Sequence, residues 1–128
     1  MTGIDHIAIW TKDLEKEKDF FLKYFECTVN DKYINSAKRF ASYFIAFTSG
    51  TRLELMTRDD ISSGADNESA GYSHIAINVG SREKVDNLTV ELENDGLIVK
   101  SRPRVTGDGY YESVILDPEN NRIEIMSD

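Results

Sequence analysis

The sequence of 128 residues contains one cysteine, Cys27, so no disulfide can form within the chain. A chain of this length buries a core without such cross-links, and we expect a reducing cytoplasm as its compartment. Long apolar runs are missing too, since the stretch "YFIAF" at 43–47 is far too short to span a bilayer. The N-terminus "MTGIDHIAIW" has no basic region followed by an apolar stretch, so we predict no signal peptide.

Positive charge is also scarce. Lys and Arg number 15 against 23 Asp and Glu, which gives a formal net charge of −8. No block of Lys and Arg stands out, and a negative field repels phosphate backbones. We therefore expect neither nucleic acid nor an anionic membrane surface as a partner.

The two histidines of the chain stand in a repeated tetrapeptide, "HIAI" at 6–9 and again at 74–77. In a second repeat, Glu54 of "RLELM" aligns with Glu124 of "RIEIM". Two copies are too few for a solenoid, so the repeats indicate a duplicated β-α-β-β-β unit.

Alternating and helical patterns predict the same order of elements in each copy. The predicted segments are a strand at 4–10, a helix at 11–26, strands at 27–35, 39–47 and 51–57, then a strand at 71–79, a helix at 81–95, and strands at 97–102, 109–116 and 121–126. Small polar residues at 59–70 predict a linker. We therefore predict one α+β domain, 1–128, with modules 1–58 and 71–128.

Side-chain alternation determines which way the repeated residues point. Leu53 and Leu55 share one face of their strand, so Glu54 lies on the other. If the apolar faces rest on the helices, all four polar residues project from the opposite face; they are His6, Glu54, His74 and Glu124. Two imidazoles and two carboxylates brought together need a positive partner, and a divalent metal with mixed nitrogen and oxygen ligands meets that need. A single His or Glu of this kind is more often structural or solvated, but the matched repeat positions favour a metal site.

From "DHIAI" to "DPENNRIEIM" the chain resembles the vicinal oxygen chelate superfamily, the glyoxalase I / bleomycin resistance / extradiol dioxygenase family, in its glyoxalase I-like branch. The resemblance implies two tandem βαβββ modules that form a cupped mixed sheet around one divalent metal ion per site. His6, Glu54, His74 and Glu124 match the His, Glu, His, Glu ligand order of that branch. Ni, Co or Zn is the implied ion, with Mn or Fe(II) as alternatives, and a homodimer is the implied assembly.

The same resemblance implies a metal-dependent lyase or isomerase, related to lactoylglutathione lyase, for a small α-oxo or vicinal-oxygen substrate. Glu124 corresponds to the mobile base, with Glu54 on the opposite side of the metal, although the repeat symmetry does not choose between them. Trp10 stands where the family has an arginine that grips glutathione, and Arg58 and Ala70 replace its usual asparagine and second arginine. We therefore do not expect strict dependence on glutathione, since its carboxylates need fixed positive donors.

Further residues, Arg58 among them, are candidates for substrate binding. Trp10 can form an apolar wall or close the end of the sheet. Arg52 and Arg122 can orient the carboxylates or meet an anionic substrate, or remain solvated. The loop "TGDGYYES" supplies Tyr110 and Tyr111, which point opposite ways in a regular strand.

Other functions of the family stay open at this level. The main alternative is a small-molecule binding protein of the bleomycin-resistance type, which sequesters an antibiotic without catalysis. An epimerase, a dioxygenase with two histidines and one carboxylate, and a thiol transferase are variants of the metal-dependent hypothesis. Cys27 has no histidine near it in the sequence, and we do not expect it to act as a nucleophile.

Overall fold

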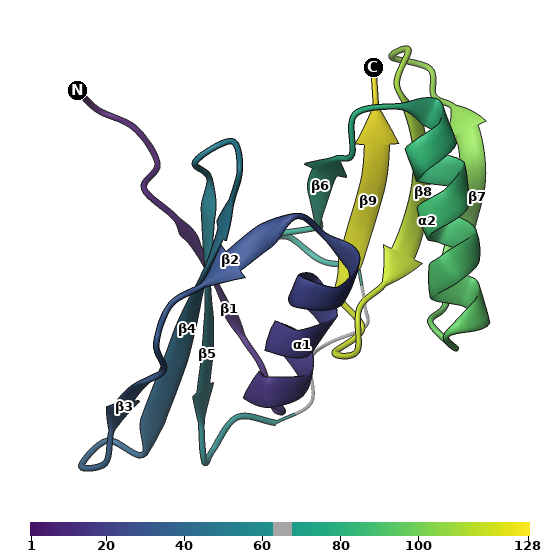
Figure 1. Cartoon of the computed structure of the whole chain (residues 1–128). Helices are drawn as coiled ribbons and strands as arrows, with labels where there is room; N and C mark the ends of the chain where they lie inside the picture. The colour runs from purple at the N-terminus through teal and green to yellow at the C-terminus, as the bar shows by residue number, and fades with distance from the viewer. Residues whose placement is uncertain (63–67) are drawn as a thin grey trace. The chain divides into compact units, whose positions relative to one another are not determined.

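The computed structural model describes residues 1–62 and 68–128 and has the predicted α+β class, with two β-α-β-β-β modules in tandem (Figure 1). The chain divides into two compact units, Met1–Gly64 and Ala65–Asp128. Residues 63–67, in the middle of the predicted linker, lie outside the described residues. The assignment of 1–128 to a single domain stays a prediction.

The first unit folds into a five-stranded sheet with one helix. Its elements are β1 (Ile7–Trp10), α1 (Leu14–Tyr24), β2 (Cys27–Val29), β3 (Tyr33–Asn35), β4 (Phe40–Phe47) and β5 (Arg52–Arg58). The strand order is β1-β5-β4-β2, and β3 pairs with β4 beside β2. Strand β1 runs parallel to β5, whereas the other pairs are antiparallel. The first and last strands of the module therefore lie side by side, and the chain between them forms the crossover that parallel neighbours require.

The strand predicted at 27–35 is two short strands in the structure. Both pair with β4, and Asn30 lies between them. The amide of Phe44 donates to the Asn30 side chain at 2.7 Å, and the Asn30 amide donates to the Phe44 carbonyl at 3.2 Å. A side-chain acceptor thus takes the place of a backbone carbonyl, which interrupts the regular ladder at this point.

Helix α1 begins with an aspartate cap and packs on the sheet through its apolar residues. Oδ1 of Asp13 accepts a hydrogen bond from the Lys16 amide at 3.1 Å, which satisfies one of the free donors of the first turn. Phe20 and Phe21 are buried, as are Leu53 and Leu55 of β5. Helix α1 therefore covers the leucine face of β5 and leaves its glutamate face uncovered by the helix.

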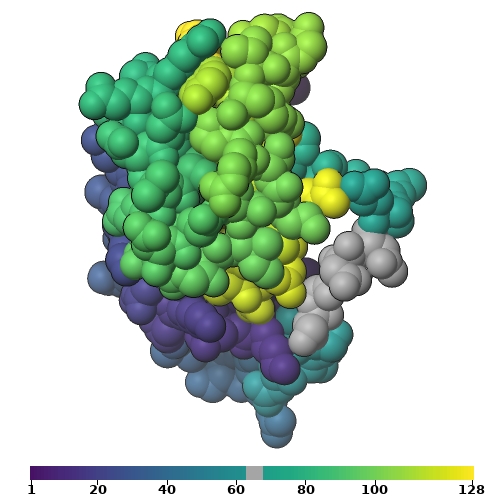
Figure 2. Space-filling view, turned by 90° about the vertical axis from the view of Figure 1, so that its right-hand side faces the viewer, coloured from purple at the N-terminus to yellow at the C-terminus, as the bar shows by residue number. Residues whose placement is uncertain are grey.

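The second unit repeats this arrangement with four strands. Its elements are β6 (His74–Asn78), α2 (Arg82–Asn94), β7 (Val99–Val105), β8 (Tyr111–Leu116) and β9 (Arg122–Ser127), in the sheet order β6-β9-β8-β7. Strand β6 runs parallel to β9, as β1 does to β5. Figure 2 views this unit from the side of α2 and β7.

Helix α2 has a cap at each end and a buried apolar side. Ser81 accepts a hydrogen bond from the Lys84 amide at 3.2 Å, and Gly96 follows the helix with a φ of 92°, the conformation in which glycine ends helices. Leu92 is fully buried, as are Ile123 and Ile125 of β9. Among the described residues, no helix is both long and apolar enough to cross a membrane.

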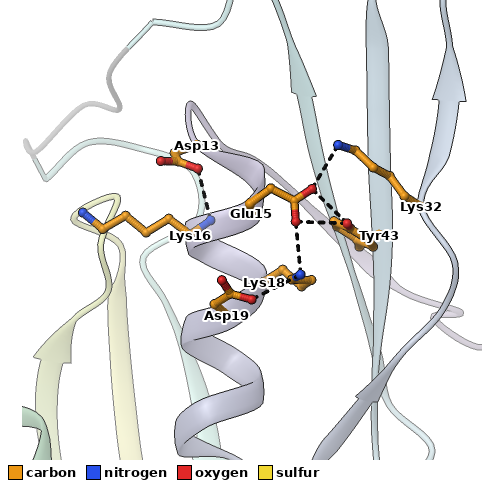
Figure 3. A network of polar contacts seen from close by, with 7 residues as sticks. All are labelled: Asp13, Glu15, Lys16, Lys18, Asp19, Lys32 and Tyr43. Atoms are coloured by element: carbon orange, nitrogen blue, oxygen red, sulfur yellow. Dashed lines mark hydrogen bonds and ion pairs between the residues drawn. The ribbon is translucent and has the colours of Figure 1, made fainter.

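A polar network ties α1 to β4 at the surface of the first unit (Figure 3). The carboxylate of Glu15 lies 2.9 Å from Nζ of Lys32, accepts a hydrogen bond from the Tyr43 hydroxyl at 2.9 Å, and pairs with Lys18 at 3.1 Å. The hydrogen bond from Lys32 is the largest cause that lowers the pKa of Glu15 to about 2, and burial opposes it. The ionised carboxylate is therefore favoured in the folded state.

We predict that Glu15→Gln lowers the free energy of unfolding at pH 7 by at most about 1 kcal/mol, because the carboxylate is half exposed and solvent screens the pairs. The folded-state pKa lies below the ordinary value of 4.5, so the stabilisation is present above that value. It is lost as the pH falls from about 4.5 to about 2. Urea unfolding at several pH values measures it, with the exposed Glu26→Gln as control. A difference between wild type and Glu15→Gln that is unchanged at pH 2 would contradict this assignment.

Candidate functional site

Each unit brings one histidine and one glutamate together. Nε2 of His6 lies 3.5 Å from Oε1 of Glu54, and Nε2 of His74 lies 3.2 Å from Oε1 of Glu124. The parallel register explains both contacts, because Ala8 pairs with Glu54 and Ala76 pairs with Glu124. Each histidine stands two residues before that alanine and so lies on the same face of the sheet.

The four side chains lie on the side of each sheet opposite its helix. The residues that flank the glutamates in β5 and β9 are fully or almost fully buried on the helix side. The glutamates themselves remain partly open, with exposed side-chain fractions of 17% for Glu54 and 20% for Glu124. The imidazoles are more open, at 33% for His6 and 39% for His74. An ion or a small molecule can therefore reach both pairs.

The second ring nitrogen of each histidine has a partner that leaves Nε2 directed at its glutamate. Nδ1 of His6 lies 2.8 Å from the carboxylate of Asp5, which also pairs with Arg52. The hydrogen bond with His6 is the first cause that lowers the pKa of Asp5, followed by the charge of Arg52. Nδ1 of His74 lies 3.0 Å from the Ser73 hydroxyl. Outer partners of this kind orient imidazoles that bind metals.

The donor set of each pair fits a divalent metal, but one pair alone supplies only two ligands. Each pair offers one imidazole nitrogen and one carboxylate oxygen, the mixed set that Zn, Ni, Co, Mn and Fe(II) accept. Within residues 1–62 and 68–128, no group of three or more His, Cys, Asp and Glu side chains is placed to hold an ion together. Each pair alone therefore supplies two donors.

Aromatic side chains lie on the sheet face that carries the first pair. The ring of Phe44 meets His6 edge-on with centroids 5.0 Å apart, and the Arg52 guanidinium lies 4.7 Å from the centre of the Phe44 ring. Trp10, at the other end of β1, is 43% exposed and lies 6.2 Å from the Phe40 ring.

The charge of Arg58 is already partnered at the Trp10 end of this face. Its guanidinium lies 4.9 Å from the Trp10 ring and donates two hydrogen bonds to Asp60, one of them 3.1 Å long. The hydrogen bond and charge of Asp60 raise the pKa of Arg58 further above its ordinary value. Trp10 and Arg58 thus form one stacked group, separate from the His6–Glu54 pair.

The predicted residues of the second unit divide between two faces. Arg122 lies on the Glu124 face and pairs with Glu68 at 2.8 Å. The Tyr111 hydroxyl instead donates to Asp86 of α2 at 2.6 Å, and the Arg82 guanidinium lies 5.0 Å from its ring. Tyr111 therefore faces the helix rather than the His74–Glu124 pair. Tyr110 precedes β8 and is 44% exposed.

The structure adds one residue that the sequence reasoning missed. Glu112, on β8, has a side chain only 11% exposed and lies on the same sheet face as Glu124. Burial is the largest cause that raises the pKa of Glu112, and the neighbouring Glu124 carboxylate raises it further. Strand alternation from Tyr111 would have placed Glu112 on the Glu124 face, but it could not have indicated burial.

Comparison with protein families finds one match. The model of the family described as "Glyoxalase/Bleomycin resistance protein/Dioxygenase superfamily" matches residues 3–125. No curated protein matches the sequence.

Solved structures with the same fold share little sequence with the chain. A glyoxylase/bleomycin resistance protein/dioxygenase domain from Frankia sp. EAN1pec has a TM-score of 0.83 at 15% identity and covers 99% of this chain and 98% of its own. The trypanothione-dependent glyoxalase I of Leishmania major has a TM-score of 0.80 at 21% identity, with 99% and 87% covered. The fosfomycin resistance protein FosX of Listeria monocytogenes, solved with Mn(II) and a sulfate ion, has a TM-score of 0.73 at 21% identity, with 100% and 93% covered. At such identities the similarity establishes the fold alone.

The reactivity of Cys27 tests whether its thiol is activated for chemistry. Its thiol donates a hydrogen bond to the Phe21 carbonyl at 3.4 Å, and burial raises its pKa. We predict that a thiol reagent modifies Cys27 more slowly at pH 7.5 in the folded protein than in urea, because less thiolate is present and access is restricted. Absorbance of the released thiolate measures both rates. An equal or faster rate in the folded protein would indicate an activated cysteine.

Proposed function

Because the chain belongs to the Glyoxalase/Bleomycin resistance protein/Dioxygenase superfamily, we propose that it is a metal-dependent lyase or isomerase of the glyoxalase I kind. The substrate class we propose is a small molecule with an α-oxo group or vicinal oxygens. One observation carries the proposal, namely that each unit holds one imidazole and one carboxylate within 3.5 Å on its helix-free face. Two such pairs together provide the donors of one metal centre.

Proteins of this superfamily bind divalent metals, and the Listeria protein was solved with Mn(II). We assign one divalent ion per site to His6, Glu54, His74 and Glu124, with Ni, Co or Zn favoured and Mn or Fe(II) as alternatives. A bound ion of this kind supplies Lewis-acid polarisation of substrate oxygens. The mixed nitrogen and oxygen donors and the partial exposure of both pairs support the assignment.

Within this proposal the glutamates also move the proton. Glu124 would take the proton from the carbon that bears the substrate hydroxyl and return it to the neighbouring carbonyl carbon, while the hydroxyl proton passes to the former carbonyl oxygen, so the isomerisation conserves all atoms. Glu54 holds the matching position in the other pair. The imidazoles keep their orientation, because Asp5 and Ser73 hold their Nδ1 atoms.

Strict use of glutathione is not part of the proposal. Trp10 offers no positive charge, and Arg58 is committed to Asp60 through two hydrogen bonds. A carboxylate of glutathione would have to compete with that pair. Trp10 beside Phe40 instead suits an apolar part of a substrate.

The second candidate is a binding protein that sequesters a small antibiotic without chemistry, in the manner of bleomycin resistance. The exposed aromatic side chain of Trp10 favours it, because such a surface binds apolar ligands without any reaction. An epimerase, a dioxygenase or a thiol transferase would use the same metal donors. In each case we propose a cytoplasmic homodimer with a small-molecule ligand, whose sites form within one chain or across two.

Metal uptake separates these candidates. We predict about one ion per chain in the untagged protein after chelation and re-addition of Ni, Co, Zn, Mn or Fe(II), measured by elemental analysis. His74→Ala and Glu124→Gln should each lose most of this metal, because each removes one of the four donors. The exposed Glu83→Gln, on α2, is the matched control and should keep it.

The identity of the ion then directs the search for substrates. Tight binding of Ni or Co favours isomerisation, whereas tight binding of Fe(II) or Mn favours oxygen or thiol-transfer chemistry. No uptake of any of the five ions would defeat the enzymatic proposal and leave the sequestering protein.

A further inference from the structure

We propose that Arg52 is a positioning residue, which holds the His6 imidazole in place from two sides, through the carboxylate of Asp5 and through the ring of Phe44. The inference rests on the proposed metal site, in which His6 is one of the four donors. Arg52 then serves an imidazole rather than a glutamate carboxylate or an anionic substrate.

Four contacts join Arg52 and its neighbours into a closed circuit. The Arg52 guanidinium donates a hydrogen bond to Oδ2 of Asp5, and the same oxygen lies 2.8 Å from Nδ1 of His6. On the other side, the guanidinium lies 4.7 Å from the centre of the Phe44 ring, which meets the His6 ring edge-on at 5.0 Å. A single guanidinium therefore contacts both neighbours of the imidazole.

The sheet register brings these side chains to one face. Phe44 pairs with Glu54 in the β4–β5 ladder, and Arg52 stands two residues before Glu54. Arg52 and Phe44 are therefore diagonal neighbours on the glutamate face. A planar guanidinium stacks on an aromatic ring and keeps its donors free in its own plane, so Arg52 can contact Phe44 and Asp5 at once.

The backbone restrains His6 less than it restrains His74. The β6–β9 ladder includes His74, which pairs with Arg122, whereas the β1–β5 ladder begins at Ile7. His6 therefore precedes its strand, in a segment, 1–6, without regular secondary structure. Backbone pairing holds His74, and the side-chain circuit supplies the restraint for His6.

The matching places of the second unit hold different residues. The residue before the histidine is Ser73, which offers a neutral hydroxyl instead of a carboxylate. Val114 occupies the place of Phe44 in the β8–β9 ladder and has no ring on which a guanidinium could stack. Arg122 pairs with Glu68 instead, at 2.8 Å. The circuit is therefore specific to the first unit.

The circuit adds little to the stability of the fold. The side chains of Asp5 and Arg52 are 72% and 38% exposed, and exposed ion pairs contribute little to the free energy of unfolding. An outer carboxylate that orients a metal-binding imidazole has a larger effect, because its loss commonly weakens metal binding by about 10- to 100-fold. The circuit should therefore affect metal binding far more than unfolding.

Variants of Arg52 and Asp5 test this role. Arg52→Met removes the charge at similar length, Arg52→Lys keeps the charge without the planar stack, and Asp5→Ala removes the carboxylate. Arg102→Met is the matched control, because Arg102 is also a strand arginine in an exposed pair, with Glu93 of α2. Chelator competition gives the metal affinity of each purified protein, and thermal unfolding without metal gives its Tm.

We expect Asp5→Ala to bind metal about 10- to 100-fold more weakly and Arg52→Met about 10-fold more weakly. Arg52→Lys should lie between Arg52→Met and wild type, because its charge still pairs with Asp5. The double variant of Arg52→Met and Asp5→Ala should stay within a few fold of Asp5→Ala, since Arg52 acts mainly through that carboxylate. The metal-free Tm of every variant, and the metal affinity of Arg102→Met, should stay close to wild type.

Two patterns would overturn the inference. Unchanged metal affinity in Arg52→Met would leave Arg52 to a solvated ion pair or to a substrate anion, whatever its Tm. Losses of affinity that add fully in the double variant would show that Arg52 does not act through Asp5.

Failure of the metal site itself is distinguishable, because the two histidines of the chain can be followed separately by NMR in the metal-free protein. Uptake of none of the metals by wild type would defeat the proposed function and, with it, the role of Arg52 in metal binding. Relaxation of the ring carbons then measures the circuit alone on the ps–ns timescale. Arg52→Met should make the His6 ring more mobile and leave the His74 ring unchanged. Equal mobility of the His6 ring in Arg52→Met and wild type would remove the structural basis of the inference as well.

Discussion

Parallel pairing between the first and last strands of each module is the constraint on which the site depends. It places Ala8 opposite Glu54 and Ala76 opposite Glu124, and the histidine two residues earlier then lies on the glutamate face. A shift of the register by one residue would turn the glutamates towards the helices and the leucines or isoleucines away from them. The buried residues on the helix side therefore specify the position of the donors as firmly as they stabilise the fold.

Much of this arrangement could be predicted from the sequence, because alternation and repetition are local signals. Both the alternation typical of strands and the duplication can be read directly from the repeated "HIAI" and the matched "RLELM" and "RIEIM". Interactions between distant segments leave no such signal. The hydrogen bond between Asn30 and β4 that divides the predicted strand 27–35 depends on tertiary geometry. So does the hydrogen bond from the Tyr111 hydroxyl to Asp86 on α2.

Glu112 is a second example, because the sequence predicts only part of its environment. Its face follows from alternation, but its burial depends on how β7, β8 and the neighbouring side chains pack. Charge partners are equally hidden in the sequence: Arg52, Arg58 and Arg122 stand in strands, and each pairs with an acidic residue outside the strand that carries it. These pairs leave the site faces less positive than the arginines alone suggest, which is consistent with a substrate that is not recognised mainly by negative charge.

The proposed metal site has a genetic consequence, because its donors are divided between two units. One chain damaged only in its His6–Glu54 half and another damaged only in its His74–Glu124 half still carry, between them, one intact half of each kind. Where sites are shared between chains, mixed assemblies of two defective alleles can restore some function that neither allele provides alone. Where each site forms within a single chain, the same two alleles together produce no functional site. Complementation between the two alleles therefore shows, inside a living cell, whether the site is shared between chains.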